Sequence, residues 1–245
     1  MLIERIRSEF KRRVNKFDSN HAKDYPDAFI DDLFNIKQLE FIDAIVEPTP
    51  NKATKFGIEA NTLSIDLISN IIKENIFISP YKVYQDKVEF LLPSDYYHIL
   101  NLKVDTDCGL FLNTKYVKQG NLNAYLTDDN TKPSKKWKRT IFNIAQSKDK
   151  TLDSSLYVYK ENFKVNGIYI SYIQEPIKVF SGGYDSLEYI TGDTSAYSSN
   201  TKKVDSSLTD STCTYIIDSM VNETFQNLEN QIGFGLIQPK INKNI

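Results

Sequence analysis

The chain has 245 residues, and 30 Lys and Arg against 32 Asp and Glu give it a formal net charge of −2. This balance excludes a broadly basic nucleic-acid-binding surface, so any contact with nucleic acid has to be local. The two cysteines, Cys108 and Cys213, are too few and too far apart for a disulfide framework or a zinc site. The charged start "MLIERIRSEFKRR" lacks a secretion signal, and no apolar run approaches the ~20 residues of a membrane span, so we expect a soluble intracellular protein.

The first 50 residues predict two helices joined by a short turn. Apolar residues recur at helical spacing in the first segment, at Ile3, Ile6, Phe10, Val14 and Phe17. The second helix opens at Pro26, carries Asp27, Asp31 and Asp32 near its positive end, and ends before Pro48. Because the connection is short, we expect the two helices to form an antiparallel hairpin.

The middle of the chain changes to a strand-like pattern. The segment "NTLSIDLISNIIKENIFIS" predicts a short helix, and "YKVYQDKVEFLL" and "ILNLKVDTD" predict two strands separated by Pro93. Residues 120–150 are polar and predict a loop insert with a small apolar island at Ile141 to Ala145. The stretch "SLYVYKENFKVNGIYISYIQEP" predicts a hairpin in which Asn166-Gly167 marks a turn or a bulge, and "IKVFSGGYDSLEYI" predicts a strand that ends in a Gly182-Gly183 turn.

A last helix is predicted from about Asp210 to Gly233, with Thr209, Asp210 and Ser211 as caps and Cys213 on its apolar stripe. Together these elements predict an α+β fold, in which an N-terminal helical hairpin and a C-terminal helix pack with an antiparallel β-sheet. We expect one domain over residues 1–233, with helices in 1–76 and 210–233 and the β-rich part in 82–190, followed by a tail, 234–245.

The stretch "LLPSDYYHILNLKVDTD" places Asp95 and two tyrosines directly before His98, one of two histidines. A general base needs a positioned partner and a pocket, and no second motif supplies them. A turn after Pro93, capped by Asp95, explains the same residues as the start of a strand. Since "SGGYDS" also lacks the residues of a phosphate or dinucleotide loop, we expect no enzyme, no metal and no cofactor, and a hydrolase using His98 ranks last among the alternatives.

The stretch "TKPSKKWKR" contains five cations around one aromatic residue and no acid, namely Lys132, Lys135, Lys136, Trp137, Lys138 and Arg139. Cations interleaved with an aromatic ring can contact a phosphate backbone or an acidic partner. A solvated loop tip explains the same composition. These residues are therefore a candidate contact for DNA or for an acidic partner.

The order of the motifs resembles the head-to-tail connector proteins of tailed bacteriophages, which are adaptor or ring proteins of short-tailed and crAss-like phages. Four stretches carry the resemblance: "YPDAFIDDLFNIKQLEFIDAIV", "FGIEANTLSIDLISNIIKE", "LLPSDYYHILNLKV", and "YISYIQEPIKV" followed by "TYIIDSMVNETFQNLENQ". They cover most of the chain, with the lysine-rich loop as an insert. In the last helix, Thr212 and Thr214 stand where the family usually has a His.

The resemblance implies a structural virion protein in the phage neck, assembled in the host cytoplasm, that connects the capsid portal to the tail. It implies a closed homo-oligomeric ring, a dodecamer that matches the portal, with the portal and other neck or tail proteins as partners. DNA would pass through the lumen without specific binding, and no membrane is involved. The alternative is a nucleic-acid-binding module that uses residues 132–139.

The tail combines apolar residues with helix breakers. Phe234, Leu236, Ile237 and Ile241 are candidates for docking on a neighbouring copy or on the portal. Gly235 and Pro239 argue against a regular helix in this segment. Folding back on its own domain is the alternative for these residues.

Overall fold

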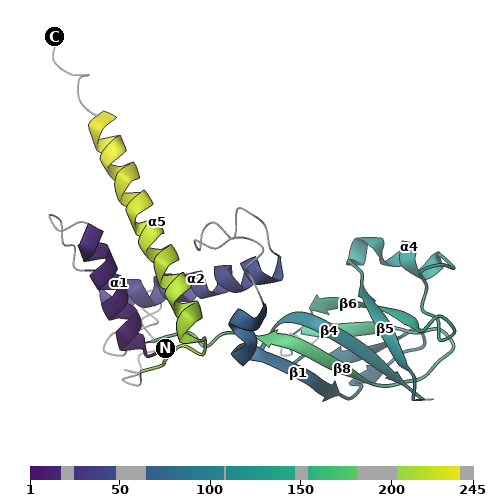
Figure 1. The fold of residues 1–245 in the computed structure, drawn as a ribbon. Helices are drawn as coiled ribbons and strands as arrows, with labels where there is room; N and C mark the ends of the chain where they lie inside the picture. The colour runs from purple at the N-terminus through teal and green to yellow at the C-terminus, as the bar shows by residue number, and fades with distance from the viewer. Residues whose placement is uncertain (18–24, 48–64, 108, 147–153, 181–202, 238–245) are drawn as a thin grey trace, which may run out of the picture. The chain divides into compact units, whose positions relative to one another are not determined.

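The computed structural model describes residues 1–17, 25–47, 65–107, 109–146, 154–180 and 203–237 (Figure 1). They form two compact units, where the sequence predicts one domain. The helical unit comprises Met1–Ile71 and Pro176–Ile245, and the sheet unit comprises Ile72–Glu175. The sheet unit is therefore one continuous segment, and the segments before and after it together form the helical unit.

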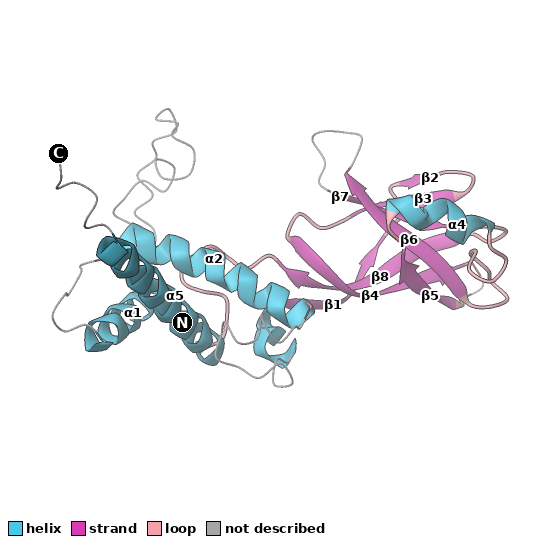
Figure 2. Ribbon diagram, turned by 90° about the horizontal axis from the view of Figure 1, so that it is seen from above, coloured by secondary structure: helices cyan, strands magenta, loops and turns pink. Residues whose placement is uncertain are grey.

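The helical unit consists of α1 (Ile3–Phe17), α2 (Asp27–Val46), the short 3-10 helix η1 (Ile65–Ile71) and α5 (Asp210–Ile237). Helices α1 and α2, expected as an antiparallel hairpin, cross at a steep angle, and α5 packs against both (Figures 1 and 2). The predicted apolar stripe of α1 is confirmed where its side chains are described, since Ile3, Ile6, Phe10 and Val14 are buried. The largest buried side chains of α2 are Phe34 and Phe41.

Ion pairs join helices that are far apart in the sequence. Arg7 of α1 binds the buried Asp31 of α2 at 3.1 Å, and Arg13 of α1 pairs with Asp218 of α5. Lys37 of α2 is buried and pairs with Glu223 of α5 and, at 2.8 Å, with Glu40. These pairs fix the register of three helices whose own backbone bonds are already satisfied internally.

The sheet unit contains one eight-stranded sheet in the order β1-β8-β4-β5-β6-β7-β3-β2. Every pairing is antiparallel except that of β5 with β6, which is parallel. Between β5 and β6 the chain forms a 3-10 turn, η2 (Gln119–Asn121), and a short helix, α4 (Leu122–Thr127). The strands are β1 Ile72–Ile78, β2 Lys82–Val83, β3 Lys87–Leu91, β4 Tyr96–Thr106, β5 Phe111–Tyr116, β6 Arg139–Gln146, β7 Ser154–Tyr159 and β8 Val165–Gln174. With six helical segments and this sheet among the described residues, the predicted α+β class is confirmed.

One face of the sheet makes the core. A single buried cluster takes side chains from β3 through β8, among them Phe90, Val104, Leu112, Leu156 and Ile170. Strands that are distant in the sheet order meet in this cluster, so the sheet curls over it (Figure 2). A smaller cluster under α4, around Leu122, Ile141 and Tyr159, covers part of the opposite face.

Several predicted elements differ from the structure. In the described part of the segment predicted as a short helix, only residues 65–71 are helical, and its β-branched end forms β1. The single strand predicted at residues 81–92 is a hairpin of β2 and β3. The predicted loop insert 120–150 contains α4 and the interior strand β6, whose apolar island is the part that packs in the core.

The predicted hairpin of residues 155–176 is wrong in its pairing. Both strands exist, but β7 pairs with β3 and β6, whereas β8 pairs with β1 and β4. The Asn166-Gly167 marker is a bulge inside β8, because Asp105 pairs with Gly167 and Thr106 already pairs with Val165. Of the strand predicted to end at Gly182-Gly183, the described part forms a single bridge between Phe180 and Val204, and the predicted turn lies outside the described residues.

Candidate functional site

The residues predicted to contact DNA or an acidic partner lie on a tight turn that leads into β6. Ser134 N donates to Arg139 O at 2.9 Å, and Arg139 N donates to Ser134 O at 3.1 Å. Between them, Lys138 N donates to Lys135 O at 3.1 Å, and Lys138 has a φ of 49°. Left-handed backbone is unusual for a lysine, so these bonds hold a defined shape. We call residues 135–138 the basic turn.

Three of the five cations of this region are engaged by the protein. Lys132 binds Asp129 at 2.7 Å, and Lys135 lies 3.6 Å from Asp107. The hydrogen bond between Lys132 and Asp129 raises the pKa of the lysine and lowers that of the carboxyl. Arg139 donates to the backbone oxygens of Lys132 at 3.2 Å and Asp129 at 2.8 Å. These three side chains therefore build the turn.

The exposed end of the basic turn is Lys136, Trp137 and Lys138. The Lys136 ammonium lies 5.3 Å from the centroid of the Trp137 ring, which is 65% exposed. Neither Lys136 nor Lys138 forms an ion pair with an acid among the residues that the structure describes. The surface available to a partner is thus two cations beside one aromatic ring, rather than five cations.

The predicted docking tail begins inside a helix. Helix α5 runs to Ile237, past Gly233, where the sequence predicts its end. A glycine in a helix costs only about 1 kcal/mol relative to alanine, so Gly233 and Gly235 do not have to end it. The backbone of Phe234, Leu236 and Ile237 is helical, and Ile241 lies outside the described residues.

The outer face of the sheet over β1, β8, β4 and β5 is open and carries aromatic residues. Phe77 pairs across the strands with Tyr169, Tyr169 with Lys103, and Lys103 with Asn113, so these side chains share one face. The Tyr169 ring lies 5.2 Å from that of Phe77 and 5.7 Å from that of Phe111, measured between centroids. Phe77 is 51% and Phe111 53% exposed. We call Phe77, Lys103, Phe111 and Tyr169 the aromatic face.

Gly167 shapes this face. A Cβ at position 167 would lie 2.3 Å and 2.5 Å from two atoms at the far end of the Phe77 ring. The ring therefore lies directly on the backbone of the bulge in β8, which keeps it beside Tyr169. The sequence analysis missed the aromatic face because it did not predict β5. The alternation of apolar and polar residues in "GLFLNTKY" was the signal that could have predicted this strand.

A second cluster on the sheet surrounds the buried carboxylate of Glu89. It accepts hydrogen bonds from the hydroxyls of Tyr84 at 3.0 Å, Ser155 at 2.9 Å and Tyr157 at 3.2 Å. Burial, followed by the charge of Glu89, raises the pKa of Tyr157 to about 12. The ammonium of Lys87 lies 4.6 Å from the Tyr157 ring centroid. Because its acceptor capacity is met by protein hydroxyls, this carboxylate has a structural role.

Among the described residues, no hydrogen bond joins His98 to Asp95. His98 lies within β4 opposite Ile173, and Asp95 accepts a hydrogen bond at 2.9 Å from the hydroxyl of Tyr172. Burial and that bond raise the pKa of Tyr172 to about 12. Tyr96 N donates to Pro93 O at 3.0 Å, which is the turn predicted after Pro93. The stretch "LLPSDYYHILNLKVDTD" thus contains the start of strand β4.

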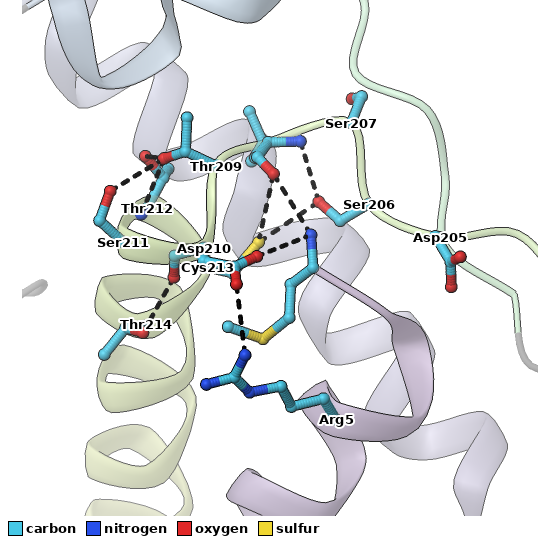
Figure 3. A network of polar contacts seen from close by, with 12 residues as sticks. Arg5, Asp205, Ser206, Ser207, Thr209, Asp210, Ser211, Thr212, Cys213 and Thr214 are labelled. Carbon is cyan, nitrogen blue, oxygen red and sulfur yellow. Dashed lines mark hydrogen bonds and ion pairs between the residues drawn. The ribbon is translucent and has the colours of Figure 1, made fainter.

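Figure 3 shows the polar contacts at the start of α5. Thr212 N donates to the Thr209 hydroxyl at 3.2 Å, which confirms the predicted cap. Thr212 donates its own hydroxyl to Leu67 O at 2.6 Å and so joins α5 to η1. The Cys213 thiol is buried as expected, its burial raises its pKa, and it lies 3.4 Å from the Ser206 hydroxyl.

Within the described ranges, no group of three or more His, Cys, Asp or Glu side chains could hold a metal ion. No described helix is long and apolar enough to cross a membrane. The sequence matches no known protein-family model and no curated protein. The connector family therefore remains a proposal.

Proposed function

We propose that this chain is a structural subunit of a ring in the neck of a tailed bacteriophage, which connects the capsid portal to the tail. The observation that carries the proposal is the order of four motifs along most of the sequence. Single motifs of this length are degenerate, and their succession gives the resemblance its weight. The partners would be further copies of the chain, the portal, and other neck or tail proteins.

The motifs coincide with features that have physical roles in the fold, which supports the proposal. "YPDAFIDDLFNIKQLEFIDAIV" contains α2, whose Asp31 and Lys37 bind the other helices. "LLPSDYYHILNLKV" contains the Pro93 turn, and Asp95 ties it to β8 through Tyr172. Motifs with structural roles of this kind indicate a shared fold, and they do not indicate a shared reaction.

A ring of more than two copies also needs two different contact surfaces on each subunit, because it is built from head-to-tail contacts between neighbours. Exposed large apolar side chains occur on both units, for example Ile36 on α2 and Phe111 on the sheet. The overall charge of −2 suits a lumen through which DNA slides without specific binding. These features support the ring, whose dodecameric number rests on the family resemblance alone.

Locating the chain in purified particles tests this function. A small epitope tag inserted between residues 161 and 162, which are exposed, should allow antibody labelling, and reconstructed necks should show the label in a ring between portal and tail. Particles whose necks carry no label, with the tagged chain absent from the virion, would refute the proposal.

A nucleic-acid-binding module is the second candidate, and the exposed end of the basic turn favours it. With only Lys136 and Lys138 unpaired among the described cations of this turn, about two phosphates would be neutralised. The slope of log K against log salt should then be about −2 for duplex DNA, at about −0.9 per phosphate. A slope several times steeper would mean that other cations contribute and would favour the module over the ring.

A further inference from the structure

The sheet unit is inserted between two parts of the helical unit, and both of its connections are short. Ile71 ends η1 and Ile72 begins β1, so no linker lies between them. On the return, Glu175 N donates to Asp95 O at 2.7 Å within the sheet unit, and Pro176 is already the first residue of the helical unit. The chain therefore passes between the units twice, each time without a linker.

Within the sheet unit, the two connections lie side by side. Ile72 pairs with Ile173 and Lys73 pairs with Tyr172, so the start of β1 lies beside the end of β8. The Cα atoms of such antiparallel partners are about 5 Å apart. The outgoing and the returning connection therefore reach the sheet unit at one place.

Within the helical unit, one residue binds both connections. The side-chain amide of Asn70, in η1, donates to Ser207 O, and Ile177 N donates to Ser207 Oγ at 3.4 Å. Ser207 is half-buried and lies in the loop before α5 (Figure 3). The same short loop therefore holds the segment that enters the sheet unit and the segment that leaves it.

The returning connection is also held on α2. Asn35 accepts from Val179 N at 2.8 Å and donates to Val179 O at 3.1 Å, so its amide takes the place of a strand partner. The Gln38 amide donates to Ile177 O at 3.4 Å. Val179 is buried, so this segment is packed as well as hydrogen-bonded.

We propose that Asn35, Asn70 and Ser207 form a clasp that makes the two connections of the sheet unit open and close together. Each connection is bound by a different atom of Ser207, so displacing this residue weakens both, and opening of one makes opening of the other easier. An open clasp would leave the sheet unit tethered by two freed segments, which is how a hinge releases a domain. The inference does not rest on the proposed function, because it concerns a single chain.

Hydrogen–deuterium exchange of the full chain, resolved to single amides, tests the clasp. The amides of Ile177 and Val179 report its opening directly, because their acceptors are the side chains of Ser207 and Asn35. The variant N70A removes a bond to Ser207 O and no bond to these amides. We expect it to raise their exchange rates at least about threefold, the effect of one lost hydrogen bond. N35A should raise the exchange rates of the η1 amides in the same way, because coupling between two sites is reciprocal.

Two controls separate coupled opening from a general loosening of the helical unit. Asn222 is exposed on α5, and N222A should leave the η1 amides and those of Ile177 and Val179 at their wild-type rates. The amides of α1 should keep their wild-type rates in every variant.

Two results would overturn the inference. If N70A raises exchange in η1 alone and N35A raises it in the returning segment alone, the two connections open independently. If the amides of α1 exchange faster by the same factor, the substitutions loosen the whole helical unit and the clasp has no role of its own. Either result is independent of whether the chain is found in particle necks.

Discussion

The helical unit and the sheet unit are held together by different chemistry. In the helical unit, buried charges cross between helices, as in the pairs of Asp31 with Arg7 and Lys37 with Glu223. In the sheet unit, the buried charge of Glu89 is met by neutral hydroxyls, and the core is apolar. Helices satisfy their backbone bonds internally, so their neighbours are fixed by side chains, whereas strands are joined directly by the ladder. The helical unit should therefore be sensitive to lost charge and the sheet unit to lost volume.

Removing volume from the sheet core should give the largest effect. Phe90 is fully buried in the main cluster, and Phe90→Ala should destabilise the sheet unit by about 3–5 kcal/mol. Urea unfolding followed by fluorescence of Trp137, the single tryptophan, should shift strongly. Far-ultraviolet circular dichroism, dominated by α1, α2 and α5, should shift less. Equal shifts of both signals would mean that the two units unfold as one, and Phe111→Ala on the open face is the matched control.

Removing a charge from the helical unit should give the next largest effect. Lys37→Met keeps most of the length of the side chain and removes the ammonium that pairs with Glu40 and Glu223, and both carboxylates reach solvent. The expected loss is therefore about 1–3 kcal/mol, below that of a fully buried pair. The circular dichroism transition should move while the Trp137 transition stays. An unchanged transition of the helical unit would show that the ion pairs of Lys37 make no net contribution to its free energy of unfolding.

Alkaline pH should weaken the sheet unit through Tyr157, which is half-buried and hydrogen-bonded to Glu89. The pKa of Tyr157 is raised to about 12, so the folded state favours the neutral phenol. Its contribution is complete below the unfolded pKa of about 10 and is lost as pH rises toward 12. The drop in urea midpoint between pH 9 and pH 11 should be smaller in Tyr157→Phe than in the wild type. The same drop in Tyr157→Phe as in the wild type would contradict the assignment.

The end of α5 should matter for assembly more than for stability. Deleting residues 238–245 leaves the described helix intact, whereas deleting 234–245 also removes its last four residues. If Phe234, Leu236 and Ile237 dock on a neighbour or the portal, only the longer deletion abolishes incorporation into particles, and both chains melt close to the wild type. A longer deletion that melts several degrees lower and still assembles would place these residues in their own unit.

The basic turn should give the smallest change in stability. Lys136→Gln with Lys138→Gln removes two exposed cations without a described acidic partner, so unfolding should change by less than about 0.5 kcal/mol. The pair Lys132→Gln and Lys135→Gln removes ion pairs that build the turn and is the matched comparison. Only the double substitution of Lys136 and Lys138 should make particle assembly more salt-sensitive. Identical particles from both pairs at every ionic strength would leave the basic turn as a solvated loop.

The sequence by itself determined the elements whose signal is local. The helical spacing from Ile3 to Val14 marks α1, Thr209 marks the start of α5, and Pro93 marks the turn before β4. In each case the deciding interaction lies within a few residues along the chain, so composition and spacing are sufficient.

Only the tertiary structure decided which elements meet. The strands β7 and β8 are adjacent in sequence yet pair with other strands, and β6 lies in a segment whose polar composition predicts a loop. Pairing partners are chosen by burial of one face against the whole cluster, which no local window contains. The same reason explains why the aromatic face was not foreseen: Phe77, Lys103, Phe111 and Tyr169 come from four strands and become one surface only when the sheet is assembled.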